Sequence, residues 1–142
     1  MMANKQTTRE DKVALFHKAM SLDVNSEARV SLLETRKNLL LEETKEAIDA
    51  MAVLQVELMR GRKPTDEQWG HLLKELADVQ YVLSGTVISF SKLPHELDTA
   101  FNRVHSSNLN KLDNNGKPVY SEDGKVLKGP NYKTPNLIDL LN

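Results

Sequence analysis

Cysteine is absent from the 142 residues of this chain, and that absence removes two classes of site. No disulfide bond can form, and a thiolate metal site has no ligands. The absence fits a reducing compartment. Aromatic residues are also few, at 5 %, although 39 % of the chain is hydrophobic. An apolar fraction that depends mainly on Leu, Val, Ala, Ile and Met favours helices over a β-sandwich.

An excess of charge of either sign is absent as well, since the formal net charge is -1. Phosphate-dependent binding of nucleic acid needs a surplus of Lys and Arg, so we expect no nucleic-acid partner. No apolar run approaches the roughly 20 residues of a membrane span. The polar start "MMANKQTTREDK" lacks the apolar core of a signal peptide. We therefore expect a cytoplasmic protein with no membrane partner.

The length suits one domain over 1–142, and most of the chain reads as four helical segments. The expected helices cover about 10–20, 26–60, 66–90 and 94–106. Asn25 or Ser26 is expected to cap the second helix. Thr65 and Gln68 have capping-box spacing at the start of the third. Residues 1–9 are expected to be flexible. The modest apolar content indicates a homo-oligomer, and the long second helix is expected to span the domain or to reach into a second subunit.

The character of the chain changes after Asn108, where Gly, Pro, Asn and Lys become frequent. The turn signals "NNG" and "EDG" flank the short apolar pieces "PVY" and "KVL", which predicts a loop or hairpin over 108–135. This segment is a candidate lid. "NLIDLL" is expected to form one last helical turn. The predicted fold is all-α, a bundle of four to five helices with an irregular C-terminal segment.

Carboxylates occupy an unexpected face of the second helix. At 100° per residue, Glu43 falls near the middle of an apolar arc and Glu46 falls at its edge. The arc consists of Leu32, Leu39, Ala50 and Leu54, with Leu40, Ala47 and Leu58 beside it. An acidic run on a helix is ordinarily a solvated face, and that interpretation of Glu42, Glu43 and Glu46 stays open here.

The third helix repeats the arrangement. Its apolar stripe consists of Leu72, Leu76, Val79, Leu83 and Phe90. Glu75 lies between Val79 and Val82 on the helical wheel, and Asp78 lies one step outside. Two helices joined by a short turn thus each place a pair of carboxylates, three residues apart, on or beside a core face.

Buried carboxylates are costly, and neighbouring ones repel one another and raise each other's pKa. A divalent cation relieves both costs. Acidic side chains at i and i+3 lie on one side of a helix, so their oxygens can converge on one ion. An all-oxygen ligand set suits Mg²⁺, with Mn²⁺ as a second option, rather than zinc.

At these residues the sequence resembles a known superfamily. The pattern is EExxE on one helix, here Glu42, Glu43 and Glu46, followed by ExxD on the next, here Glu75 and Asp78. It is similar to the all-α nucleoside triphosphate pyrophosphatases: the MazG-like proteins, the dimeric dUTPases and the phosphoribosyl-ATP pyrophosphatases. The pieces "VHSSNLNK" and "DGKVLKGPNY" resemble C-terminal elements of one MazG-like branch.

The resemblance implies a MazG-like helical bundle that assembles as a homodimer or homotetramer. It also implies Mg²⁺-dependent hydrolysis of a nucleoside triphosphate between its α and β phosphates. The products would be a nucleoside monophosphate and pyrophosphate, and the role would be nucleotide-pool housekeeping. Glu43, Glu46, Glu75 and Asp78 would bind the metal. Glu42 and Glu43 are the candidate catalytic residues. Glu42 would be either a further metal ligand or the residue that orients the attacking water.

The polyphosphate also needs cations and hydrogen-bond donors. Residues 101–133 hold six Lys or Arg and three acids, a local net charge of +3. The candidate substrate-binding residues are His17, Asn108, Lys111, Lys125, Lys128 and Tyr132. For each lysine, a place on an ordinary solvated loop is the alternative interpretation.

Two alternative functions stay open. The motifs specify the metal and the bond that is cleaved, but not the base, so the substrate could be dUTP, dCTP or phosphoribosyl-ATP. The second alternative is a non-catalytic helical dimer that a metal stabilises.

Overall fold

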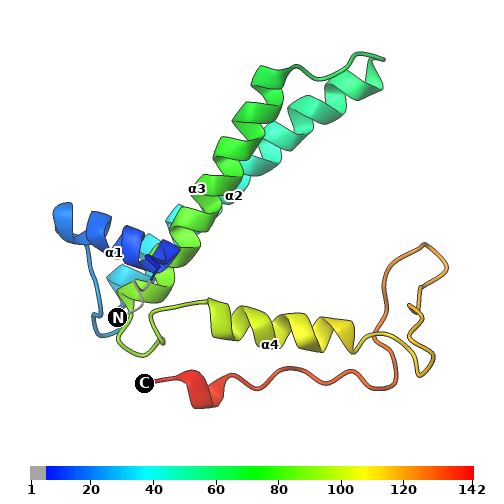
Figure 1. Cartoon of the computed structure of the whole chain (residues 1–142). Helices are drawn as coiled ribbons and strands as arrows, with labels where there is room; N and C mark the ends of the chain where they lie inside the picture. Colours follow the sequence, from blue (N-terminus) through cyan, green and yellow to red (C-terminus); the bar gives the residue numbers. More distant parts are fainter. Residues whose placement is uncertain (1–5) are drawn as a thin grey trace. The chain divides into compact units, whose positions relative to one another are not determined.

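The computed structural model describes residues 6–142, and in these residues the protein is all-helical. Four α-helices and one short 3-10 helix follow one another along the chain (Figure 1). The prediction of an all-α fold is confirmed. The chain divides into two compact units, the first ending at His95 and the second covering Glu96–Asn142. The assignment of both to one domain stays a prediction.

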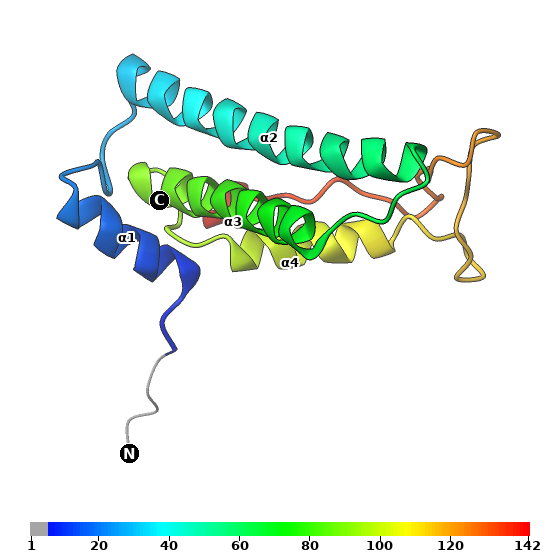
Figure 2. The same cartoon turned by 90° about the horizontal axis from the view of Figure 1, so that it is seen from above.

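Helix α1 (Arg9–Ala19) begins at a capping box. The Thr8 hydroxyl accepts from the Asp11 N–H at 3.0 Å, and the Asp11 carboxylate accepts from the Thr8 N–H at 3.0 Å. Its bounds agree with the prediction to within one residue. Of residues 1–9, expected to be flexible, 1–5 lie outside the described residues, whereas Thr8 and Arg9 start the helix. Figure 2 shows α1 beside the end of α3 that leads to Phe90.

Helix α2 (Val30–Met59) begins later than expected, at an Arg29 cap without a side-chain hydrogen bond. The predicted cap at Asn25 or Ser26 is wrong. The Asn25 N–H donates to the Ile88 carbonyl and the Ser26 N–H to the Ser89 carbonyl, each at 2.8 Å. Because Asn25 and Ser26 pair with the backbone at the end of α3, they cannot cap a helix, and α2 starts only at Val30.

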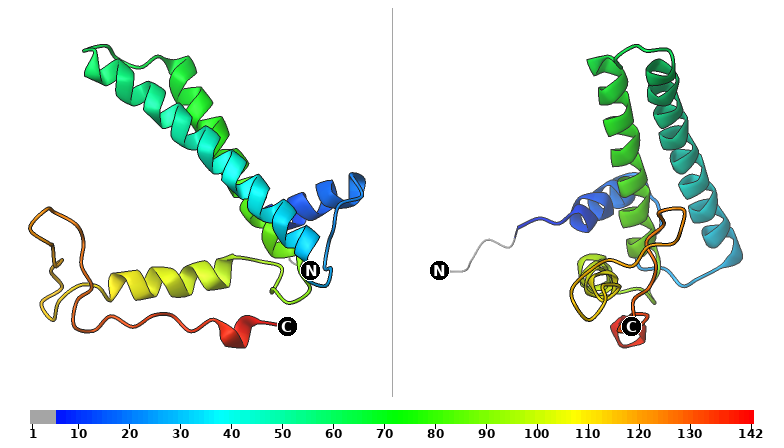
Figure 3. Two further views of the ribbon diagram at one scale, coloured as in Figure 1. Left: turned by 180° about the vertical axis from the view of Figure 1, so that it is seen from behind. Right: turned by 90° about the vertical axis from the view of Figure 1, so that its right-hand side faces the viewer.

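Helix α3 (Asp66–Ser89) starts at the predicted capping box of Thr65 and Gln68. It runs antiparallel to α2, and the two lie side by side in a long hairpin (Figure 3). Ala50, Leu54 and Leu72 form a buried apolar cluster between them. Because α2 and α3 pack along this narrow apolar stripe, Glu43 on the same side of α2 is turned toward α3.

Several apolar side chains that the helical wheels placed on or beside the core arcs are exposed. Leu58 of α2 is 61 % exposed, and Leu76 and Leu83 of α3 are 44 % and 38 % exposed. Two helices packed along one stripe can cover only the side chains that face each other. The predicted burial of these three leucines is therefore wrong for a single chain.

Helix α4 (Asp98–Leu109) lies in the second unit and begins four residues later than the predicted start at Pro94. His95 has a φ of 61°, which is left-handed backbone that a helix cannot incorporate. The helix therefore starts after His95, and its first residue is Asp98. Within the same unit, the Ser107 hydroxyl donates to the Lys133 carbonyl at 2.6 Å and Arg103 pairs with Asp139, so the C-terminal segment follows α4 (Figure 1).

The predicted hairpin is present in a minimal form. Tyr120 and Val126 form one antiparallel bridge, and the Leu127 N–H donates to the Val119 carbonyl at 2.8 Å. No extended strand occurs in residues 6–142. The last expected turn is the 3-10 helix η1 (Ile138–Leu140). None of the helices in the described part of the chain is both long and apolar enough to cross a membrane.

Candidate metal centre

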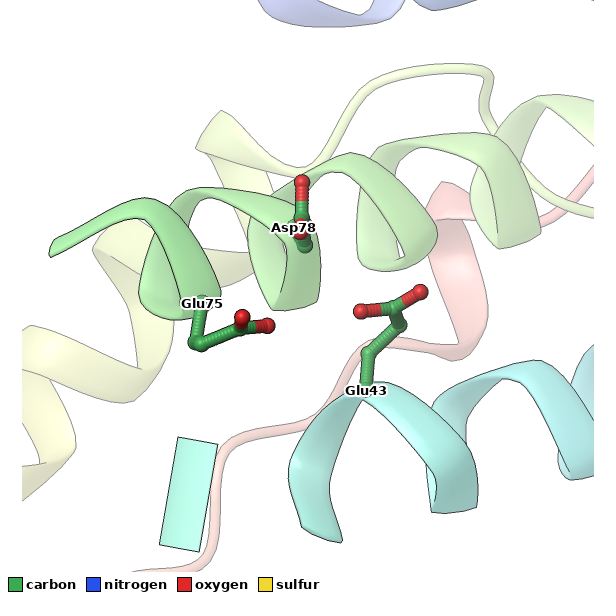
Figure 4. Close-up of side chains that lie close together, drawn as sticks. All are labelled: Glu43, Glu75 and Asp78. Carbon is green, nitrogen blue, oxygen red and sulfur yellow. The ribbon is translucent and has the colours of Figure 1, made fainter. Parts of the chain in front are cut away.

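Three of the predicted carboxylates converge between α2 and α3. Glu43 of α2 and Glu75 and Asp78 of α3 each offer one oxygen, and these oxygens lie within 4.8 Å of one another. In Figure 4, Glu43 extends from its helix toward Glu75, with Asp78 one turn further along α3. We call these three residues the carboxylate triad.

Local sequence explains the convergence. Glu75 and Asp78 are separated by three positions, so their side chains project from one side of α3. Glu43 lies on the stripe of α2 that also holds the buried residues Ala47 and Ala50. The packing that buries the apolar stripe therefore brings Glu43 to α3.

The triad is short of hydrogen-bond partners. Glu75 is only 3 % exposed. Among the described residues, Glu43 Oε2 and Glu75 Oε2 are buried and have no hydrogen-bond partner. An unpaired buried carboxylate oxygen is costly. Burial is the largest cause that raises the pKa of Glu43, followed by the charges of Glu46, Asp78, Glu42 and Glu75.

These features fit a hard divalent cation. The donor set is all oxygen, which is the set that Mg²⁺ and Mn²⁺ prefer. A bound cation would supply the partners that Glu43 Oε2 and Glu75 Oε2 lack, and it would offset the repulsion that raises the pKa of Glu43. The predicted metal residues Glu43, Glu75 and Asp78 are thus brought together.

Two basic side chains on the rim were not anticipated from the sequence. Lys74 Nζ lies 2.7 Å from Asp78 Oδ2 and 3.5 Å from Glu75 Oε1, and His71 Nε2 lies 3.6 Å from Glu75 Oε1. The i,i+4 spacing of His71 to Glu75 and of Lys74 to Asp78 would have revealed both contacts. The Lys74 side chain is 64 % exposed, so its ion pairs contribute little to stability.

Glu42 and Glu46 remain outside the triad. Both are exposed on α2, although both charges raise the pKa of Glu43. A carboxylate at the exposed edge can still reach a cation from a different rotamer. The roles of Glu46 as a ligand and of Glu42 as a catalytic residue stay predictions.

His17, a candidate substrate contact, is 3 % exposed. Its Nδ1 lies 2.9 Å from the Asp23 carbonyl oxygen, which can only accept a hydrogen bond, so Nδ1 carries the proton. This bond ties α1 to the segment that leads into α2. A role of His17 in substrate binding stays a prediction.

Three of the other candidate contacts gather within the second unit. The Nζ atoms of Lys111 and Lys128 lie 5.7 Å and 4.8 Å from the Tyr132 ring centroid. A hydrogen bond with Ser107 is the largest cause that lowers the pKa of Tyr132, and the two lysine charges act in the same direction. Asn108 is exposed on the last turn of α4. Lys125 is exposed in the turn of the short β-hairpin that the Tyr120–Val126 bridge closes.

No model of a known protein family matches the chain, and no curated protein sequence matches it significantly. The resemblance to the all-α nucleoside triphosphate pyrophosphatases therefore stays a prediction.

Proposed function

We propose that the protein is a Mg²⁺-dependent nucleoside triphosphate pyrophosphatase. One observation carries the proposal: Glu43, Glu75 and Asp78, from two adjacent helices, each bring one oxygen within 4.8 Å of the others, and Glu43 and Glu75 each also have a buried oxygen without a hydrogen-bond partner. Lys74 pairs with Asp78 and lies near Glu75 Oε1, but the two unpartnered buried oxygens destabilise the fold when no cation is bound. The carboxylate triad is therefore best understood as a site for a cation.

Glu43, Glu75 and Asp78 would hold Mg²⁺, and Glu46 is the proposed fourth ligand from the edge of α2. The cation would neutralise the triphosphate, polarise the phosphoryl group and lower the pKa of a bound water. Without such mediation, the carboxylates would repel the anionic substrate. Glu42 or Glu43 would orient the attacking water and accept its proton.

The proposed products are a nucleoside monophosphate and pyrophosphate, with service in nucleotide-pool housekeeping. Asn108, Lys111, Lys125, Lys128, Tyr132 and His17 remain the proposed substrate contacts. A cytoplasmic location and a homodimeric or homotetrameric state belong to the same proposal.

Hydrolysis of a panel of canonical and modified nucleoside triphosphates, with the products separated, tests this function. Wild-type protein with Mg²⁺ should give monophosphate and pyrophosphate, and the panel should rank the bases. Glu43→Gln should lose this turnover. Asp49→Asn, an equivalent change on the exposed face of α2 where Asp49 pairs with Lys45, should keep it.

The products also separate the alternatives. Orthophosphate and a nucleoside diphosphate would show that a different bond is cleaved. A protein that binds Mg²⁺ but hydrolyses no nucleotide would be a non-catalytic module. Equal activity of Glu43→Gln and Asp49→Asn would contradict the assignment of the site.

A further inference from the structure

A buried guanidinium crosses the same helix pair two turns from the triad. Arg36 of α2 is only 7 % exposed. Its Nη2 donates to the Val82 carbonyl at 2.9 Å, and its Nε donates to the Thr86 hydroxyl at 3.1 Å. The Thr86 hydroxyl in turn donates to the Val82 carbonyl at 2.8 Å. Arg36 is thereby held by α3 at two neighbouring points.

The location of Arg36 is energetically unusual. Burial lowers its pKa, because a charged group loses hydration there. Within the described residues, the hydrogen bonds of its side chain go to neutral oxygens rather than to a carboxylate. Leucine at this position would fill an apolar stripe without a desolvation cost. The residue therefore contributes something other than hydrophobic stability, and directional contact is what a guanidinium supplies.

Gly85 provides the space for this side chain. A Cβ atom at position 85 would lie 2.6 Å from Arg36 Nη2, closer than Cβ atoms come to other heavy atoms, and 3.0 Å from His17 Nε2, which is a tight contact. Glycine inside a helix costs roughly 1 kcal/mol relative to alanine, so it needs a packing reason. The slot for the guanidinium supplies that reason.

The spacing links this contact to the triad. Arg36 precedes Glu43 by seven residues on α2, and Val82 follows Glu75 by seven residues on α3. Seven residues are two helical turns, or roughly 10 Å, and they return to nearly the same face. In an antiparallel hairpin, the contact of Arg36 with Val82 and the approach of Glu43 to Glu75 therefore require one and the same register.

Apolar contacts specify that register poorly. The cluster on the other side of the triad consists of Ala50, Leu54 and Leu72, whose contacts are non-directional. A buried polar residue with fixed hydrogen-bond partners can select one register among several, as single buried polar residues do in coiled coils. Arg36 is such a residue in this hairpin.

We infer that Arg36, seated over Gly85, is a positioning residue that sets the α2–α3 register at which Glu43 meets Glu75 and Asp78. It thereby sets the affinity of the triad for a divalent cation. The inference rests on the cation site of the proposed function. It assigns to Arg36 no contact with the cation or with substrate.

Mn²⁺ binding to the full-length chain, followed by the electron paramagnetic resonance signal of the free ion, tests this inference. Arg36→Met replaces the guanidinium by an apolar side chain of similar length and so removes the hydrogen bonds to Val82 and Thr86. It should weaken Mn²⁺ binding by roughly tenfold or more, the scale typical of residues that orient metal ligands. Gly85→Ala should weaken binding in the same direction, because it displaces the guanidinium while Arg36 remains present.

Leu54→Ala is the matched control, since it opens a cavity in the same interface on the opposite side of the triad. It should lower the melting temperature while Mn²⁺ affinity stays at the wild-type value. All variants are compared at a temperature where circular dichroism shows the native helix content. Arg36→Lys, which keeps the charge without the planar fork, should restore only part of the affinity.

The outcomes separate the two proposals. Wild-type protein that binds Mn²⁺, with Arg36→Met and Gly85→Ala equally tight, would overturn the positioning role and leave the cation site standing. An equal loss of affinity in Leu54→Ala would also overturn it, because loosened packing would then suffice. Wild-type protein that binds no Mn²⁺ would overturn both proposals. Should Arg36→Met fail to fold, Gly85→Ala and Arg36→Lys carry the comparison.

Discussion

At the scale of single residues, Glu43 combines partial burial with a concentration of like charge. One of its oxygens is buried without a partner, and four neighbouring carboxylates raise its pKa in addition to burial. In the absence of a cation, the ionised form of this side chain opposes folding. The same feature that makes Glu43 a good ligand makes it a poor contributor to stability.

Replacing Glu43 by Gln should therefore stabilise the metal-free protein in a pH-dependent manner. The pKa of Glu43 is higher in the folded chain than in the unfolded chain. The free energy of unfolding of the wild type should thus fall as pH rises from the unfolded to the folded pKa, and stay reduced above it. Thermal melts in chelator should show Glu43→Gln as the more stable protein at neutral pH. This advantage should disappear below about pH 4.

Mg²⁺ supplies the control for this prediction, since it should raise the melting temperature of the wild type more than that of Glu43→Gln. A stability difference of the same size at every pH, or equal stabilisation of both proteins by Mg²⁺, would contradict it.

The face of each carboxylate could be predicted from the sequence, because helical periodicity alone places Glu43 and Glu75 on core stripes. The environment of Arg36 could not, since its partners Val82 and Thr86 are distant in the chain. From the sequence alone an arginine on a helix is expected at the surface, and only the packing of α3 against α2 shows that Arg36 is buried. The exposure of Glu46 depends on the angle between the helices, which periodicity does not determine.

At the scale of elements, the start of a helix can be predicted where its capping residues are neighbours in the sequence. The start of α3 follows from Thr65 and Gln68, whose two hydrogen bonds measure 3.2 Å and 2.9 Å. The start of α2 was not predictable, because Asn25 and Ser26 bond to the end of α3, more than sixty residues away. Local capping rules cannot anticipate such a long-range competitor.

Thr65→Ala should therefore destabilise the first unit by about 1 kcal/mol, the typical cost of removing an N-cap. The loss of the Thr65 hydroxyl leaves the Gln68 N–H without its capping acceptor. Urea denaturation followed by circular dichroism measures the change. Thr35→Ala, in the middle of α2 where the hydroxyl only bonds back to the Ser31 carbonyl, is the matched control and should cost less. Equal costs would show that the capping box contributes nothing specific.

At the scale of the whole molecule, each unit leaves large apolar side chains uncovered. On the hairpin of the first unit, Leu41 and Leu73 are each 69 % exposed, and Trp69 is 52 % exposed. Leu73 also lines a hollow of about 450 Å³ between α1 and α3, together with Val13 and Tyr81. The expected homo-oligomer would cover such surface, because burial of apolar area drives most protein association.

Leu73→Asp should accordingly shift the oligomer toward monomer, since a carboxylate in an apolar interface would be desolvated without a partner. Sedimentation velocity of the variant and the wild type at equal concentrations measures the shift. Asn38→Asp adds the same charge at another exposed position of the hairpin and should leave the oligomer intact. A wild-type protein that sediments as a monomer would contradict the expected assembly.

The metal-dependent pyrophosphatase activity is tested most directly by pyrophosphate release from a nucleoside triphosphate, measured for the wild type and for Glu75→Gln, with Mg²⁺ and with chelator. Glu75 is the most deeply buried member of the triad, and glutamine retains its shape while removing its charge. Pyrophosphate should appear only from the wild type with Mg²⁺, while Glu75→Gln keeps the native helix content. Pyrophosphate released at the same rate by Glu75→Gln, or by the wild type in chelator, would contradict the proposed metal-dependent pyrophosphatase activity.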